Sequence, residues 1–136
     1  MNRGADEGTD APRRREGAAN RGAREAWGRW AESLAAWSLR LRGYRILARR
    51  FRTPLGEIDL VARRGGLLAF VEVKARADLE QALAALGQRQ RERTVRAAEL
   101  FLLRRPDLAG LTLRFDLIAV RPWRLPRHLC DAWRPR

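Results

Sequence analysis

Two runs of mainly apolar residues, 57–64 and 67–74, are joined by a diglycine at 65–66, and this pattern constrains the fold more than any other feature. Branched aliphatic residues are typical of strands, and a diglycine is favoured in a two-residue hairpin turn because glycine tolerates a positive φ. The runs therefore predict an antiparallel hairpin in which Arg64 pairs with Leu67. That one pair fixes the register of all the others.

The predicted register brings four charged side chains to one face of the hairpin. Asp59 falls opposite Glu72. Glu57 falls opposite Lys74, and side chains two residues apart on a strand share a face. Two carboxylates whose Cβ atoms are about 5 Å apart repel each other by about 3 kcal/mol at an effective dielectric constant of about 20. A proton, the Lys74 ammonium or a divalent cation must offset this repulsion.

The candidate ligands at this face are oxygen atoms. The carboxylates of Asp59 and Glu72 and the main-chain carbonyl of Val73 are hard ligands, which favour Mg²⁺ or Mn²⁺ over softer metals. Lys74, the only lysine among 29 basic residues, stands beside them. Its compact amine is able to orient or deprotonate an attacking water, which a guanidinium does poorly. The simpler alternative is a solvated sheet face closed by ion pairs such as Glu57 with Lys74.

Positive charge is concentrated in the part of the chain that is expected to fold. The net charge is +13, and residues 1–26 hold six arginines against five acids, so the remaining 110 residues carry a net charge of +12. A field of this sign favours a polyanionic partner such as DNA, or less simply RNA, whereas the alternative is that the charge serves solubility alone. The arginines best placed to hold phosphates flank the predicted hairpin and the long helix after it: Arg49, Arg52, Arg76, Arg89 and Arg93.

Cysteine and histidine each occur once, at Cys130 and His128. A single cysteine forms no internal disulfide, and these two residues do not make a cysteine or multi-histidine zinc site. Neither has a recognisable partner for a catalytic triad, so both are predicted to lie in loops or packing contacts. No apolar run reaches the roughly 18 residues of a membrane span, and the N-terminus lacks a signal-peptide pattern, which predicts a cytoplasmic protein without membrane association.

The chain is predicted to contain one domain after a short extension. Residues 1–24 are rich in Gly, Ala, Arg and Asp and are predicted to be disordered, because they bury too little apolar surface to offset the entropy of ordering. Residues 25–136 are long enough for one domain. Its first element is a predicted helix over residues 25–42, in which apolar residues recur at helical spacing. Three tryptophans of this helix are expected in the core: Trp27, Trp30 and Trp37.

The remaining elements are predicted from periodicity and turn residues. They are a strand over 44–51, the hairpin, helices over 79–86 and 88–105, and a strand over 111–120. The proline-rich residues 121–136 are predicted to form a loop that ends in a helical turn. The order αβββααβ indicates an α/β or α+β sandwich.

Asp59 followed by Glu-Val-Lys at 72–74 resembles the PD-(D/E)xK signature of nucleases that have the restriction-endonuclease-like fold. Two longer runs, Gly-Glu-Ile-Asp-Leu-Val at 56–61 and Phe-Val-Glu-Val-Lys-Ala-Arg at 70–76, resemble the YraN family, uncharacterised protein family 0102. Bacterial members of that family are described as endonucleases. The resemblance extends over about residues 27–133.

This resemblance implies both a fold and a chemistry. Residues 25–136 would form an endonuclease-like domain with a mixed β-sheet flanked by helices in the order αβββαβ. Asp59 and Glu72 would bind Mg²⁺ or Mn²⁺, and Lys74 would position the nucleophile. Glu32, on the first predicted helix, matches a position at which related nucleases carry a further acid near the metal. The implied activity is metal-dependent hydrolysis of phosphodiester bonds in DNA, including branched or structured DNA.

One departure from the family pattern leaves a second function open. The family commonly has a lysine before the Arg-Ala-Ala segment at 96–98, where the nearest residues here are Gln90 and Arg91. The alternative is a nucleic-acid-binding protein of the same fold with weak or no catalysis. A further alternative is a protein-interaction module that uses exposed Trp123 and Trp133. Many nucleases of this fold dimerise to cut two strands, which leaves a homodimer open here.

Overall fold

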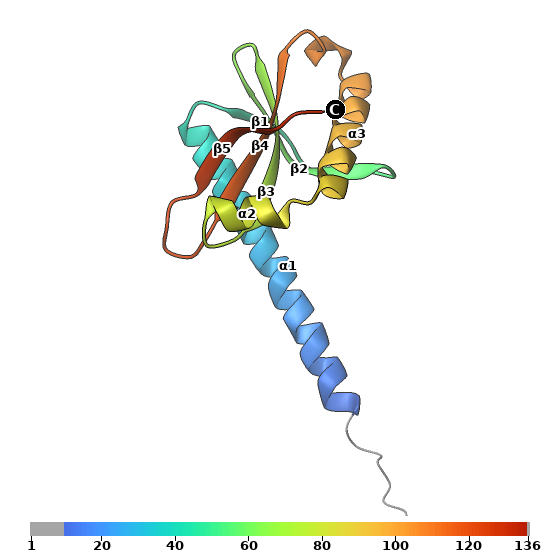
Figure 1. Cartoon of the computed structure of the whole chain (residues 1–136), viewed down its shortest axis with the longest axis vertical. Helices are drawn as coiled ribbons and strands as arrows, with labels where there is room; N and C mark the ends of the chain where they lie inside the picture. The colour runs from blue at the N-terminus through green and yellow to red at the C-terminus, as the bar shows by residue number, and fades with distance from the viewer. Residues whose placement is uncertain (1–9, 136) are drawn as a thin grey trace, which may run out of the picture.

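The fold is built on one five-stranded sheet, in which neighbouring strands follow the order of the chain (Figure 1). A computed structural model describes residues 10–135. The strands are β1 (Arg45–Thr53), β2 (Gly56–Arg64), β3 (Leu67–Ala75), β4 (Thr112–Val120) and β5 (Arg127–Trp133). Strands β3 and β4 are parallel, and the other neighbouring pairs are antiparallel.

Helices cover both faces of this sheet. Helix α1 (Asp10–Leu41) packs against one face, and helices α2 (Leu79–Ala85) and α3 (Gln88–Arg104) pack against the other. Together with the short 3₁₀ helix η1 (Pro106–Leu108), α2 and α3 provide the long crossover that the parallel pair β3–β4 requires. The mixed sheet between helices confirms the predicted α+β class.

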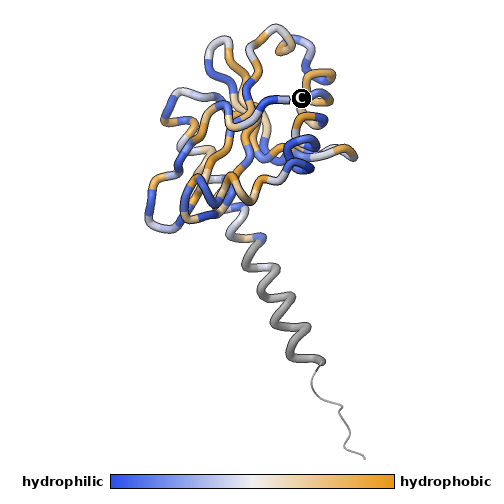
Figure 2. The backbone as a smooth tube through the Cα atoms, in the orientation of Figure 1, coloured by the Kyte–Doolittle hydropathy of each residue, from blue (hydrophilic) through white to orange (hydrophobic). Residues whose placement is uncertain are grey.

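Each face of the sheet has its own hydrophobic core. Leu60 and Val71 pack against α1 on one face. On the other face, Phe70 stacks on Phe115 with ring centroids 5.4 Å apart, beneath α2 and α3. Figure 2 shows the hydrophobic segments gathered in the central strands. Because both faces are covered, the central strands are apolar at most positions, and buried charges in them require a specific explanation.

The β2–β3 hairpin has the predicted register. Its pairs begin with Arg64 opposite Leu67 and end with Leu60 opposite Val71. Gly65 in the turn has a φ of +59°, a conformation that glycine adopts without steric cost. Backbone pairing ends one residue before the acids that the register predicts as neighbours.

Gly56 sets the distance between the β1–β2 turn and α3. A Cβ atom at this position would lie 2.2 Å from the main-chain oxygen of Arg93, which is closer than such atoms can approach. The missing side chain therefore lets the first turns of α3 rest on the β1–β2 turn. This contact fixes the helix that carries Gln90 and Thr94 toward β3.

The prediction that the tryptophans of α1 lie in the core is wrong. Trp30 and Trp37 are 48% and 61% exposed, and Trp27 is half-buried. The helix instead buries a stripe of smaller residues: Ala31, Ala35, Ala36 and Leu39. Small side chains let the helix lie close to the sheet at native packing density, and indoles on that stripe would hold it away.

The C-terminal segment also differs from its prediction. Residues 127–133 form β5, which pairs with β4 at the edge of the sheet, rather than a loop with a helical turn. The prolines of the segment flank this strand instead of interrupting it, which an edge strand tolerates. Trp133 is buried against Phe115, so it does not belong to an exposed interaction surface, whereas Trp123 is fully exposed.

Helix α1 begins at Asp10, within the segment 1–24 whose composition predicts disorder. Alanine and arginine are frequent in that segment and have high helix propensity, which accounts for the difference. Residues 1–9 lie outside the described residues, and the boundary between an extension and a domain beginning at residue 25 stays a prediction. Across residues 10–135, none of the helices combines the length and the apolar character needed to cross a membrane.

Candidate active site

The acids of β2 and β3 meet where the backbone pairing of the two strands ends. Asp59 Oδ2 accepts a 2.8 Å hydrogen bond from the main-chain N–H of Val73, so this side chain replaces a backbone partner. Glu72 is only 2% exposed. The two carboxyl groups lie close enough for the negative charge of Asp59 to act on Glu72. The structure thus brings together the two acids that the register predicts as neighbours.

The surroundings of this pair favour protonation of both carboxyl groups. Burial raises the pKa of Asp59, although the N–H of Val73 and the charge of Lys74 act in the opposite direction. Burial also raises the pKa of Glu72 well above its usual range, and the negative charge of Asp59 raises it further. Two ionised carboxylates are costly in this position, so a proton or a cation between them is favoured.

Gln90 on α3 links the lysine to the buried acid. Lys74 Nζ donates a 2.9 Å hydrogen bond to Gln90 Oε1, and Gln90 Nε2 donates one of 3.2 Å to Glu72 Oε2. The hydroxyl of Thr94, one helical turn further along, donates to Glu72 Oε1 at 3.1 Å. Lys74 therefore lies beside the acids but is held by a neutral amide.

These two helix residues are not predicted as site residues from the sequence. In the sequence, Gln90 differs from the lysine that is common in the family, and no motif includes Thr94. A weak signal exists, because the two polar residues lie four positions apart on the stripe of α3 that also buries Ala97 and Phe101. Polar residues on a buried helical stripe need hydrogen-bond partners, which here are on β3.

Glu32 approaches Asp59 from α1. Its side chain is 12% exposed and accepts a 2.6 Å hydrogen bond from Nε of Arg50. Burial raises the pKa of Glu32 despite this bond, and the charge of Asp59 adds to the rise. Arg50 has a φ of +51°, a left-handed conformation that is unusual for a residue in a strand. Strained backbone of this kind is often found at functional sites.

Asp59 and Glu32 open onto a cleft of about 450 Å³ between α1, β1 and β2. Three arginines also line this cleft: Arg29, Arg50 and Arg52. Glu57 is 61% exposed and lies 3.6 Å from Arg52, so it does not form an ion pair with Lys74. The interpretation of this face as a set of solvated ion pairs is therefore wrong, since the lysine binds an amide and Glu72 is buried.

The five arginines predicted to hold phosphates are all exposed, and they lie on the elements that carry the site. Two belong to β1, one follows β3 and two lie in the first turns of α3: Arg49, Arg52, Arg76, Arg89 and Arg93. Arg52 lines the cleft beside Asp59. Phosphate binding by these residues stays a prediction, as does metal coordination by the carbonyl of Val73.

A second buried acid lies on β4, the neighbour of β3. Asp116 accepts two hydrogen bonds of 2.7 Å from the guanidinium of Arg114. It also accepts one of 3.0 Å from the N–H of Asp131 and lies 2.8 Å from His128 Nε2. Burial acts to raise the pKa of Asp116, but these hydrogen bonds outweigh it and lower the pKa. The network ties β5 to β4 and neutralises the acid from within the fold.

The exposed thiol of Cys130 lies beside this network, with Sγ 3.6 Å from His128 Nε2. The ligand atoms of Asp116, His128 and Cys130 all lie within 4.8 Å of one another. Both His128 and Cys130 lie on β5, so the prediction that they lie in a loop is wrong. A catalytic triad is not formed, because the acid and the thiol share one ring nitrogen. A metal centre is disfavoured, because the Arg114 guanidinium already neutralises the carboxylate.

The chain is similar to proteins of one family. The model of the Uncharacterised protein family UPF0102 matches residues 31–120, which include Glu32, Asp59, Glu72 and Lys74. A UPF0102 protein of Paramagnetospirillum magneticum is 58% identical over 111 residues, which cover 79% of this chain and 86% of that protein. A UPF0102 protein of Chelativorans sp. is 50% identical over 129 residues, which cover 95% of this chain and 99% of that protein. The chain therefore belongs to UPF0102, the YraN family that its motifs resemble.

Proposed function

We propose that this protein is a metal-dependent nuclease that hydrolyses phosphodiester bonds in DNA. One observation carries the proposal: the neighbouring acids Asp59 and Glu72 both have raised pKa values, and Gln90 links Glu72 to the amine of Lys74. Holding two acids together in this way opposes folding unless a positive charge joins them. A cation bound during catalysis accounts for the arrangement.

The residues present fit Mg²⁺ or Mn²⁺. The ligands would be the carboxylates of Asp59 and Glu72 and the main-chain carbonyl of Val73, and such hard oxygen donors match these hard cations. Glu32 influences the Asp59 carboxyl and would add negative charge near the ion. The ion, when bound, supplies Lewis acidity that stabilises negative charge on the phosphoryl oxygens.

The remaining functions would come from side chains of β3 and α3. Lys74 would orient the attacking water or take its proton, and its Nζ is held in place by Gln90. Gln90 and Thr94 would also keep Glu72 in one orientation through their hydrogen bonds to its two oxygens. Because the amide of Gln90 is neutral, the charge of the lysine is left to attract the phosphate.

The expected substrate is DNA that is recognised through its phosphates. The exposed arginines on β1 and α3 supply charge but no base-reading motif, so the structure of the DNA rather than its sequence would select the substrate. A homodimer would allow both strands of a duplex to be cut. A location in the bacterial cytoplasm would give access to the chromosome.

A nucleic-acid-binding protein without turnover is the second candidate function. The enclosure of Glu72 and the presence of Gln90, where the family commonly has a lysine, favour it. Such a protein would bind DNA in a salt-sensitive way, and Lys74→Ala would leave its affinity nearly unchanged. A nuclease would lose cleavage with the same substitution.

The test is cleavage of end-labelled branched, single-stranded and duplex DNA by the full chain in the presence of Mn²⁺. We expect the wild type to cut at least one substrate, EDTA to stop the reaction and Asp59→Asn to abolish it. Asp107→Asn removes an exposed acid of η1 at the other end of the sheet and should cut like the wild type. The proposal fails if the wild type cuts nothing, or if Asp59→Asn cuts equally well.

A further inference from the structure

A second cleft, with a volume of about 450 Å³, lies at the carboxyl ends of the two parallel strands. Arg76 follows β3 there, and Arg121 and Arg124 lie in the turn that follows β4. Trp27 of α1 lines the same hollow, which we name the β3–β4 cleft. Ligands of open sheets often bind beyond the carboxyl ends of parallel strands, so this is a favourable place for a binding site.

No acid lines the β3–β4 cleft among the residues that the structure describes. Nε of Arg121 is buried and has no hydrogen-bond partner among the described residues, and a buried donor without an acceptor is costly. Among residues 25–135, no acid forms an ion pair with Arg76, Arg121 or Arg124. Three guanidinium groups beside one hollow favour phosphate, whose oxygens accept hydrogen bonds from a guanidinium in pairs.

One tryptophan lines this cleft, and a second lies in the turn that borders it. Trp27 lines it, and Trp123, in the same turn as Arg121 and Arg124, is 100% exposed. Trp123 has a φ of +61°, a left-handed conformation that bulky residues rarely adopt. The turn thus holds an indole in solvent with a strained backbone and no burial in return. Strain without a packing benefit points to a binding function.

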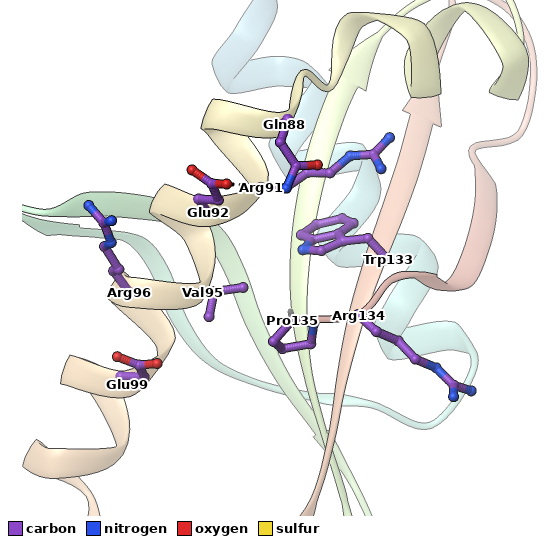
Figure 3. A pocket seen from close by; sticks show the side chains of 9 residues that line it. All are labelled: Gln88, Arg91, Glu92, Val95, Arg96, Glu99, Trp133, Arg134 and Pro135. Carbon is purple, nitrogen blue, oxygen red and sulfur yellow. Dashed lines mark hydrogen bonds between the residues drawn. The ribbon is translucent and has the colours of Figure 1, made fainter.

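Figure 3 shows a different cleft, between α3 and the C-terminal residues, whose lining differs in charge from that of the β3–β4 cleft. Three arginines and two acids line it: Arg91, Arg96, Arg134, Glu92 and Glu99. Arg134 is paired with Asp131, so each arginine of this cleft has an acid nearby in the lining or in an ion pair. Trp133 lies in its wall as a buried part of the core. Among the clefts described here, only the β3–β4 cleft combines a half-buried indole with arginines and no acid in its lining.

We infer that the β3–β4 cleft, together with Trp123, binds unpaired nucleotides of DNA. Bases would stack on the two indoles and phosphates would bind the three arginines, which is the combination found on surfaces that bind single strands. The alternation of flat faces and charges matches the alternation of bases and phosphates along a strand. A continuous duplex fits less well, because its bases already stack on one another.

This inference rests on the proposed nuclease function and names its substrate class. Arg76 follows Lys74 by two positions, so an unpaired segment in the β3–β4 cleft would lie at the end of the strand that carries Lys74 and Glu72. The substrate would then be a single strand, a flap or a junction that has unpaired nucleotides next to the cleaved phosphate.

The inference is tested by fluorescence anisotropy of a labelled single strand and a matched duplex, with the full chain in EDTA so that nothing is cut. Trp123→Ala should fold normally, since its side chain is fully exposed, and should weaken single-strand binding about fivefold or more. Duplex binding should change by less than about twofold. Trp37→Ala, which removes an exposed tryptophan elsewhere on α1, should bind both ligands like the wild type.

Charge is tested in the same assay. Arg124→Ala should lower the salt dependence of single-strand binding by about 0.7 in log–log slope, as expected for one lost phosphate contact. Arg40→Ala removes the same charge from the last turn of α1 and should leave the slope unchanged. The inference is overturned if the wild type binds no single strand, or if Trp123→Ala weakens single strand and duplex equally or not at all.

Two variants separate this inference from the proposed function. If Asp59→Asn binds the single strand like the wild type and Trp123→Ala does not, single-strand binding by the β3–β4 cleft is supported even when no DNA is cut. If the wild type and Trp123→Ala cut single-stranded and duplex DNA equally well with Mn²⁺, the proposed nuclease activity is supported and single-strand binding by the β3–β4 cleft is refuted.

Discussion

Glu72 and Asp116 are both buried acids on neighbouring strands, but their surroundings differ in charge. Asp116 is paired with the guanidinium of Arg114, and its pKa is lowered. Glu72 faces a second acid, Asp59, and its pKa is raised well above its usual range. A bound cation would neutralise the charge of Glu72, whereas the guanidinium of Arg114 already neutralises Asp116. Burial alone therefore does not distinguish these two acids; the absence of a neutralising partner makes Glu72 the candidate active-site acid.

The two acids should also affect stability in opposite directions. The hydrogen bonds of Asp116 connect Arg114 on β4 with His128 on β5, and Arg114 also donates to the hydroxyl of Tyr44. That acid therefore holds the edge of the sheet together. Glu72 adds repulsion to the centre of the metal-free protein, as expected when part of the fold is arranged for function rather than stability.

The largest effect is expected at the neutralised acid. Arg114→Ala leaves Asp116 buried without its guanidinium partner, and breaking a buried ion pair in this way costs about 3–5 kcal/mol. Urea unfolding followed by tryptophan fluorescence measures the loss. Arg134→Ala, which breaks an exposed pair with Asp131, should cost far less stability, because water screens that pair. Equal losses would show that Arg114 does not neutralise Asp116 and would remove the contrast with Glu72.

A cation should bind at Glu72 and not at Asp116. We expect calorimetric titration with Mn²⁺ to reveal one site, which Asp59→Asn or Glu72→Gln weakens about a hundredfold or more, since each removes a proposed ligand. The cluster of Asp116, His128 and Cys130 is unchanged in these variants. Mn²⁺ binding that survives both substitutions would place the ion at that cluster and contradict the comparison.

The neighbour of Glu72 on β2 could be predicted from the sequence. A diglycine turn and the alternation of side chains are local features, and together they placed Asp59 opposite Glu72, which the structure confirms as a contact. The neighbours on α3 could not be predicted in the same way. Gln90 and Thr94 reach Glu72 because α3 rests on a glycine of the β1–β2 turn, a tertiary contact that no local pattern encodes.

The neutralised acid was harder to predict because it depends on β5. That strand is short, partly polar and bordered by prolines, and these features favour a loop prediction. Without β5, His128 has no predictable contact with Asp116.

The buried face of helix α1 was also predicted wrongly. Its tryptophans were expected in the core because of their size, but Ala31 and Ala35 make the close contact with the sheet. Periodicity identified the helix and did not identify which stripe is buried.

Gly56→Ala should affect the site of Glu72 and leave that of Asp116 intact. The added Cβ atom would collide with the main-chain oxygen of Arg93, and overpacking of this kind costs about 1–3 kcal/mol. We expect lower stability in urea and, because α3 shifts, weaker cleavage. Gly66→Ala meets no atom within 4 Å and is the matched control, for which no loss is expected. Equal behaviour of the two variants would mean that α3 does not position the site.

The pH dependence of stability should have opposite signs for the two acids. The folded pKa of Glu72 is raised above its usual value of 4.5, so its stabilising contribution is present below that pH and is lost as pH rises through the folded pKa. Glu72→Gln should therefore be more stable than the wild type at neutral pH in EDTA, and the difference should vanish in acid. Urea unfolding across this pH range checks the sign.

Asp116 provides the reference for that measurement. Its folded pKa is lowered below the usual value of 3.8, so its contribution to stability is present above that pH and is lost as pH falls through the folded pKa. Asp116 is present in both the wild type and Glu72→Gln, so the loss of stability that its protonation causes at low pH should be the same in both. A Glu72→Gln variant that is less stable than the wild type at neutral pH would show that Glu72 is already neutralised within the fold.

The smallest effect is expected at Glu57, the acid that the hairpin register places opposite Lys74. Glu57 is exposed and lies 3.6 Å from Arg52, so water screens the pair and Glu57→Gln should change stability by less than about 0.5 kcal/mol. Calorimetry should find the affinity for Mn²⁺ changed by less than about twofold, because an exposed carboxylate gains little from a nearby cation. A large loss would mean that the exposed acid holds the ion. A small loss would mean that the close pair Asp59 and Glu72 binds the cation and that the exposed Glu57 is not needed.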